Sequence, residues 1–185
     1  GQQYIKALTG LFTGDTGESY YYARDVSALF AERLQPTLSL GGITLLITII
    51  VGIPLGVISA WRHNSLLDRS LMGTAIIGST IPNFVLGILL IFLFALKLRL
   101  LPSGGYGTRE HYILPIIDLS VAPIASVARL TRSSLLDVIN QEYLDASRAR
   151  GASKWVVTIK HGLRNALIPV ITILGSQLSA LIGGS

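Results

Sequence analysis

The sequence predicts an all-α, polytopic membrane protein with about four spans. Half of the 185 residues are hydrophobic and only 14% are charged, whereas soluble domains carry about a quarter charged residues. The hydrophobic residues gather in long runs, and a helix needs about 20 apolar residues to cross a bilayer. We expect spans at about 38–60, 71–96, 113–131 and 166–185, which together form a membrane domain over 38–185.

The segment 1–37 precedes this domain and is too polar to lie in the bilayer. It holds a turn-rich cluster at 14–19, GDTGES. Between residues 26 and 34 the apolar side chains recur at helical spacing. We predict a short amphipathic helix on the membrane surface, and we expect Pro36 to end it because proline interrupts helical hydrogen bonding.

The first two predicted spans differ in polarity. The run 38–60 has no ionisable group, whereas 71–96 contains a polar notch, Ser79-Thr80-Ile81-Pro82-Asn83. Polar side chains at that depth need partners within the protein or a water-filled path. Ser79 and Asn83 therefore form hydrogen bonds between helices or line a translocation path, and both interpretations stay open.

The last two predicted spans each carry a polar candidate for the translocation path. Asp118 is the only acidic residue within a predicted span, and an ionisable group inside a membrane is by default a functional hypothesis. Asp118 also lies only about 8 Å from the predicted start of its span. Two other interpretations therefore stay open: its carboxylate reaches the membrane–water interface, or the span begins earlier than residue 113. Gln177, with Ser176 and Ser179, makes one side of the last span polar.

The distribution of basic residues predicts the orientation. Nine of the 15 Lys and Arg residues fall on the side of the bilayer that carries 141–164, and the rest fall on the other side. Positive charge is enriched in cytoplasmic loops. We therefore expect 141–164 in the cytoplasm and 1–37 outside it.

The charged stretch 141–164, QEYLDASRARGASKWVVTIKHGLR, predicts a helix, a break and a second helix. Good helix formers run to Arg150, and Gly151 readily takes the left-handed conformation that ends a helix. Ser153 is a candidate N-cap for the second helix. Its predicted apolar face holds Ala152, Trp155, Val156, Ile159 and Leu163.

This stretch resembles the cytoplasmic coupling loop of ABC importer permeases. That loop reads Glu-Ala-Ala, three residues, Gly, nine residues, then Ile-x-Leu-Pro. Here Asp145-Ala146-Ser147 is followed at the same spacing by Gly151 and by His161-Gly162-Leu163-Arg164. Asp145, Ser147 and Arg164 depart from the general pattern.

One branch of that family is more similar. Glu142-Tyr143, Ala149-Arg150-Gly151 and the run from His161 to Pro169 resemble the first permease subunit of dipeptide and oligopeptide importers, which usually carries Arg at the position of Arg164. Pro82 with Asn83-Phe84-Val85-Leu86-Gly87 is also similar to a motif of the family.

The resemblance implies a type I ABC importer transmembrane domain in the cell (inner or plasma) membrane, with the chain as a fragment that lacks one span at each end. The implied partners are the lipid bilayer, a second homologous permease, two cytoplasmic ATPase subunits and an extracytoplasmic solute-binding protein, with no nucleic acid. The coupling loop would dock on an ATPase. The residues implied in coupling are Glu142, Tyr143, Asp145, Ala146, Ser147, Arg148, Ala149, Arg150, Gly151, His161, Leu163, Arg164 and Asn165.

Several other chemistries find no support in the sequence. It contains no phosphate-binding loop of the form GxxxxGK[ST], no cysteine and no clustered histidines. We expect a transport subunit without enzymatic activity, metal or cofactor of its own, with ATP and magnesium on partner subunits. A nickel or glutathione importer permease stays an alternative, as does a passive channel or a structural membrane anchor.

Overall fold

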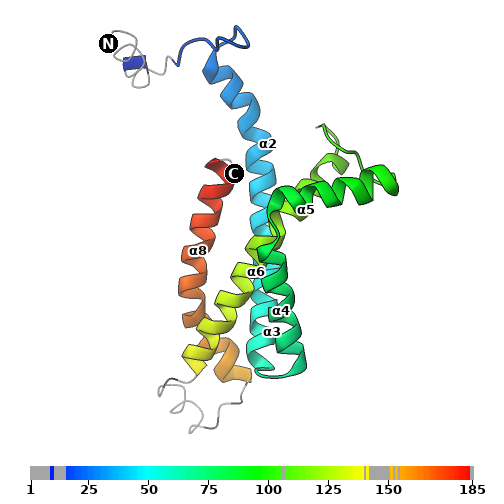
Figure 1. The fold of residues 1–185 in the computed structure, drawn as a ribbon. Coiled ribbons are helices and arrows are strands. Elements are labelled where there is room, and N and C mark those ends of the chain that lie inside the picture. The colour runs from blue at the N-terminus through cyan, green and yellow to red at the C-terminus, as the bar shows by residue number, and fades with distance from the viewer. Residues whose placement is uncertain are drawn as a thin grey trace. The chain divides into compact units, whose positions relative to one another are not determined.

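The computed structural model describes residues 9–10, 16–105, 107–139, 141, 151, 153 and 155–183, without the side chains of Lys160, His161 and Ile182. These residues form helices joined by turns, and no strand occurs among them (Figure 1). The chain divides into two units, residues 1–39 and 40–185. The elements are α2 (Val26–Ile47), η1 (Thr48–Gly52), α3 (Ile53–Trp61), α4 (Leu66–Thr80), α5 (Asn83–Leu90), η2 (Ile91–Lys97), α6 (Glu110–Ile139), η3 (Val156–Gly162) and α8 (Leu163–Gly183).

In the first unit, the start of α2 is fixed by a side-chain cap. The Asp25 carboxylate accepts a hydrogen bond of 3.1 Å from the backbone N–H of Ser27, at the exposed helix start. The helix then continues through Pro36, so the prediction that Pro36 ends it is wrong. A proline removes one backbone donor, while the flanking residues keep theirs, and the Thr37 hydroxyl adds a hydrogen bond of 3.0 Å to the Arg33 carbonyl.

The helices α2, η1 and α3 follow one another without a break from Val26 to Trp61. This stretch contains the predicted span 38–60 and is long and apolar enough to cross a membrane. The π-helical turn η1 precedes Pro54, which occupies the first turn of α3. Proline is tolerated there because the nearby helical turns rearrange to satisfy the freed backbone groups.

The predicted span 71–96 is not one straight helix. Helices α4 and α5 meet at an angle of 96° (Figure 1). Ile81 is extended, with φ −72° and ψ 121°, which is the conformation that a residue before proline favours. The polar notch at Pro82 therefore breaks the span into two helices, and only the bent pair together has the length of a span.

Helix α6 forms the centre of the second unit, in contact with α3, α4, α5 and α8. It runs from Glu110 to Ile139, longer at both ends than the predicted span 113–131, and contains Pro115 and Pro123. It approaches α3 closely at Gly56, where an added Cβ would lie 2.5 Å from the Ala128 carbonyl oxygen. Small residues permit such backbone contact between membrane helices.

A buried cluster joins α6 to α8, the last described helix. Val127, Val170 and Leu174 pack together, with Leu45 and Ile49 against them. Helix α8 covers the predicted span 166–185 as far as residue 183. By length and composition two helices qualify as membrane spans, Val26–Trp61 and Glu110–Ile139, or three if the bent pair counts as one. The fourth span stays a prediction.

Candidate functional site

Within the predicted coupling loop 141–164, the structure describes residues 141, 151, 153 and 155–164. Glu142, Tyr143, Asp145, Ala146, Ser147, Arg148, Ala149 and Arg150 lie outside the described residues. Gly151 has φ +86°, which confirms the predicted left-handed conformation. A residue with a side chain would be strained there by about 1 kcal/mol or more.

The predicted start of the second helix is also confirmed. The Ser153 hydroxyl accepts a hydrogen bond of 3.4 Å from the backbone N–H of Val156, and its carbonyl accepts one of 3.0 Å from Val157. This is the geometry of an N-cap. The helix continues as η3 through His161 into α8, which begins at Leu163 and contains Arg164 and Asn165.

The predicted apolar face of this helix is confirmed only in part. Leu163 packs against a buried cluster and Ile159 is half-buried, while Ala152 lies outside the described residues. Trp155 and Val156 are 59% and 37% exposed, whereas Val157 is 1% exposed. The reason is the π-helical hydrogen bonding of η3, in which residues five apart, such as Val157 and Gly162, come to the same side. The periodicity of 3.6 residues that the prediction assumed does not hold over this stretch.

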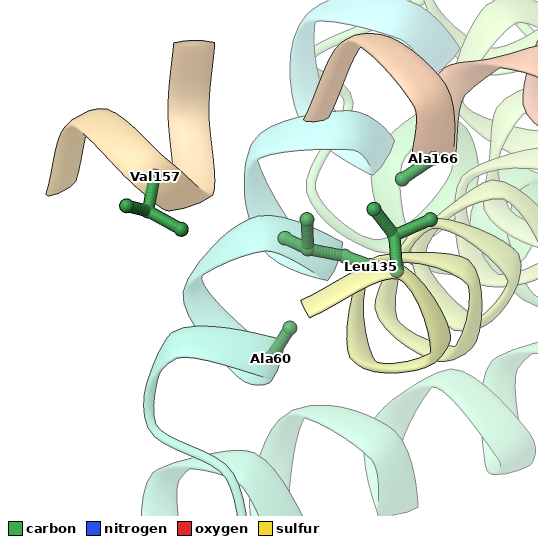
Figure 2. Close-up of a cluster of buried hydrophobic side chains, with 5 residues drawn as sticks. Ala60, Leu135, Val157 and Ala166 are labelled. Atoms are coloured by element: carbon green, nitrogen blue, oxygen red, sulfur yellow. The ribbon is translucent and has the colours of Figure 1, made fainter. Parts of the chain in front are cut away.

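Val157 connects the coupling segment to three other helices. Figure 2 shows its side chain with those of Ala60 from α3, Leu135 from α6 and Ala166 from α8, which form one buried cluster. Beside the cluster, the rings of Trp61 and Trp155 lie edge to face with centroids 5.4 Å apart. Helix η3 therefore packs directly against α3 and α6, and it continues along the chain into α8.

A polar network at the same end of α6 escaped the sequence analysis. Asp68, 2% exposed, receives two hydrogen bonds from Arg132 of α6, Nε to Oδ1 at 2.7 Å and Nη2 to Oδ2 at 2.8 Å. The Ser59 hydroxyl and the Asn64 backbone N–H also donate to this carboxylate. The ion pair is bidentate, which is the strongest geometry for arginine and a carboxylate.

His63 lies at the edge of this network. Its Nδ1 is 3.0 Å from Nη2 of Arg132 and 3.6 Å from Oδ2 of Asp68. The network therefore joins α3, the turn after it, α4 and α6. The only sequence signal was the presence of Asp68 and Arg132 near the ends of two apolar runs, which does not show that residues 64 positions apart form a pair.

Ser79, a candidate for the translocation path, bonds between helices. Its hydroxyl accepts a hydrogen bond of 2.7 Å from Nη1 of Arg129 in α6 and donates one of 3.0 Å to the Ile76 carbonyl. Arg129 also reaches the Ala75 carbonyl at 3.4 Å. This arrangement matches the interpretation of the polar notch as a helix-to-helix contact.

The other three candidates lie in different surroundings. Asn83 is exposed at the start of α5. Gln177 of α8 has an enclosed Oε1, and among the described residues nothing donates a hydrogen bond to it. Asp118 of α6 faces α5, since a Cβ added to Gly87 would lie 3.4 Å from its Oδ2. The described part of the chain does not bring Ser79, Asn83, Asp118 and Gln177 into one site.

Asp118 borders a cavity of about 330 Å³ formed by α5, η2, the loop after η2 and α6. Most of its walls are apolar, with Ser103 and His111 as the other polar side chains. The Oδ1 atom of Asp118 is enclosed and accepts no hydrogen bond from any described residue. Within the described ranges no three His, Cys, Asp or Glu side chains gather as they would around a metal ion.

Comparison with known proteins gives consistent similarities. The chain is 42% identical to the dipeptide transport system permease protein DppB of Bacillus subtilis over 184 residues, covering 99% of this chain and 60% of that protein. It is 41% identical to the glutathione transport system permease protein GsiC of Pectobacterium atrosepticum, with 99% and 60% covered. It is 36% identical to the probable peptide ABC transporter permease protein y4tP of Sinorhizobium fredii, with 98% and 61% covered. The chain thus spans about three fifths of the length of these relatives.

A solved structure shares the fold. The inward-facing MetNI methionine ABC transporter matches with a TM-score of 0.69 at 23% identity, covering 85% of this chain and 71% of the matched one. The chain therefore has the fold of a type I ABC importer permease. A family model, described as the binding-protein-dependent transport system inner membrane component, matches residues 52–185. On this match and these identities, the chain belongs to the family of inner membrane components of binding-protein-dependent transport systems.

Proposed function

We propose that the chain is the transmembrane permease subunit of an ATP-driven ABC importer for dipeptides or oligopeptides. The family match and the relatives named as dipeptide and peptide permeases support this proposal. A permease of this kind forms part of the translocation path and changes conformation when ATPases act on it. The observation that carries the proposal is the packing of η3 through Val157 against α3, α6 and α8.

This packing gives the coupling loop a physical role. Residues 142–151 would dock on an ATPase subunit, with Arg148 and Arg150 supplying charge and Glu142 and Tyr143 part of the surface. A push on the loop would move η3, and Val157 would pass the movement to Leu135 of α6. Leu163, Arg164 and Asn165, with His161 just before them, would join the loop to α8.

The proposed assembly contains partners with complementary roles. A second homologous permease would complete the path, two cytoplasmic ATPases would hold ATP and magnesium, and a solute-binding protein would deliver the substrate from outside. The permease itself would not hold ATP, since its sequence has no phosphate-binding loop. The segment 1–37 and the loop 98–109 would then lie on the extracytoplasmic side.

Glutathione is a second candidate substrate. The similarity to GsiC of Pectobacterium atrosepticum, 41% identical, is almost as high as the similarity to DppB. Glutathione and dipeptides share a primary ammonium group, a peptide bond and a carboxylate, so one path could serve either. Competition between labelled dipeptide and glutathione for uptake distinguishes them.

Co-purification of the full-length chain tests the proposed coupling. We expect the native chain to retain an ATPase subunit. The variant Arg148→Glu with Arg150→Glu should lose it, because the two new negative charges would be repelled by the ATPase surface that accepts the arginines. The pair Arg99→Glu with Arg109→Glu is the matched control, since it changes charge equally in the loop after η2. If the native chain brings down no ATPase, the proposed importer function is contradicted. If only the control variant loses the ATPase, the assignment of 142–151 to the docking side is contradicted.

A further inference from the structure

The cavity beside Asp118 is built so that its carboxylate stays free. Oδ1 is enclosed without a hydrogen-bond donor among the described residues. On the Oδ2 side, Gly87 of α5 contributes no side chain, and an added Cβ would already be in contact at 3.4 Å. The glycine thus leaves α5 close to the carboxylate without filling the space next to it.

The polar groups around the cavity do not neutralise this carboxylate. His111 is held by Thr108, whose hydroxyl lies 2.7 Å from the imidazole Nδ1. The bends of the loop bring Gly105 against the other side of the ring, where an added Cβ would be 3.1 Å from Nε2. The two salt bridges of the second unit within the described ranges both involve Asp68. An enclosed carboxylate oxygen without a donor costs free energy, which a cationic ligand would offset.

We propose that this cavity is a substrate subsite on the extracytoplasmic side of the translocation path, in which Asp118 binds the primary ammonium group of a peptide. The inference rests on the proposed function. Its volume of about 330 Å³ is at the lower end of small-molecule pockets, so it holds the amino-terminal residue rather than a whole oligopeptide. The apolar walls, such as Leu90 and Leu114, would contact the side chain of that residue.

An ammonium group fits this site better than a metal ion does. A divalent cation takes several oxygen or nitrogen ligands, and the polar side chains of the cavity are one carboxylate, one imidazole and the Ser103 hydroxyl. A single carboxylate in apolar surroundings suits one charge-assisted hydrogen bond. The loop after η2, which lines the cavity, would lie on the extracytoplasmic side, where the proposed solute-binding protein delivers its substrate.

Uptake by the complete reconstituted importer is the primary test. We expect Asp118→Asn to lower the initial rate of alanyl-alanine uptake about tenfold or more, which corresponds to losing one hydrogen bond to a charged group. Asp118→Glu keeps the carboxylate and should retain more activity than Asp118→Asn. Co-purification of the second permease and the ATPases, and dipeptide binding by the solute-binding protein, should be unchanged in both variants.

Chemical labelling tests binding in the cavity directly. This chain has no cysteine, so Ser103→Cys places one thiol at the cavity, and its reaction with a cationic methanethiosulfonate is read as a mass shift of this chain. Saturating alanyl-alanine should slow the reaction at Ser103→Cys. Thr74→Cys is the matched control, because it borders a second, apolar cavity of about 260 Å³ between α4 and α6 and should show no protection.

The outcomes separate this inference from the proposed function. If the native importer takes up dipeptide and Asp118→Asn does so equally well, the subsite is wrong and the importer stands. If Asp118→Asn loses the second permease, the carboxylate pairs with that subunit, and the subsite is again wrong. If the native importer takes up no dipeptide, the proposed function fails and the subsite falls with it.

Discussion

Two aspartates, Asp118 within α6 and Asp68 of α4 beside it, have opposite surroundings. Asp68 is buried at one end of the bundle, and Arg132, Ser59 and Asn64 all donate to its carboxylate. Asp118 borders a cavity near the other end, and its enclosed oxygen has no donor among the described residues. A carboxylate whose hydrogen bonds are all made within the chain holds helices together, whereas one left without donors is available to a ligand. The comparison predicts that substitutions at the two positions affect stability differently.

The largest effect is expected at Asp68. Asp68→Ala leaves the Arg132 guanidinium without its partner in a partly buried position, and such losses cost about 3–5 kcal/mol of unfolding free energy. Denaturation of the purified full-length complex by SDS, followed by tryptophan fluorescence, measures the change. The double variant Asp68→Ala with Arg132→Ala is the control and should lose less than Asp68→Ala alone. A single variant as stable as the native chain would remove the structural role assigned to the network.

An intermediate effect is expected at Ser79. Ser79→Ala removes the 2.7 Å hydrogen bond from Arg129, while the weaker contact of 3.4 Å to the Ala75 carbonyl remains. We expect a loss of about 1 kcal/mol in the same denaturation experiment. Ser79→Thr keeps the hydroxyl and should stay near the native value. Unchanged stability together with reduced uptake would instead assign Ser79 to the translocation path.

The smallest effect on stability is expected at Asp118. Asp118→Leu breaks no hydrogen bond to a described residue and removes a charge from apolar surroundings, so the unfolding free energy should stay within about 1 kcal/mol of the native value or rise. Asp68→Leu, with the same change of side chain, should lose several-fold more. Equal destabilisation by both variants would show that Asp118 is structural too, and the comparison would no longer hold.

The sequence predicted the features that depend on neighbouring residues. The left-handed Gly151 and the Ser153 cap were both predicted, because each follows from the conformational preferences of one or two residues. The polar notch at Pro82 was recognised, but the bend of 96° that it introduces into the predicted span 71–96 was not. The long apolar runs likewise predicted helices, and the structure places helices over each of them. The resemblance in the coupling loop predicted the family before any geometry was known.

The features that the sequence did not predict depend on tertiary contacts or on hydrogen bonds shared along a helix. The Asp68–Arg132 pair joins residues 64 positions apart, and no local pattern marks it. Val157 is buried because η3 is π-helical, which a 3.6-residue period does not reveal. Pro36 was expected to end a helix that continues, because the surrounding hydrogen bonds tolerate the loss of one donor. The lack of a hydrogen-bond donor for Asp118 depends on how α5 and the loop after η2 pack around it, which the sequence does not show.

Pro123 lies in α6 between the two aspartate environments, five residues after Asp118 and six before Arg129. Because proline has no N–H, the Leu119 carbonyl loses its usual helical donor, and a helix bends most easily where this ladder is interrupted. Helix α6 can therefore bend at Pro123, between the segment before it, which carries Asp118, and the segment after it, which carries Arg132. The segment after Pro123 packs against Val157 and Asp68. When it tilts, the segment before Pro123, with Asp118, need not tilt through the same angle. The end of α6 with Asp118 and the end with Arg132 can thus have different functions, and Pro123 limits how strongly a movement of one end is passed to the other.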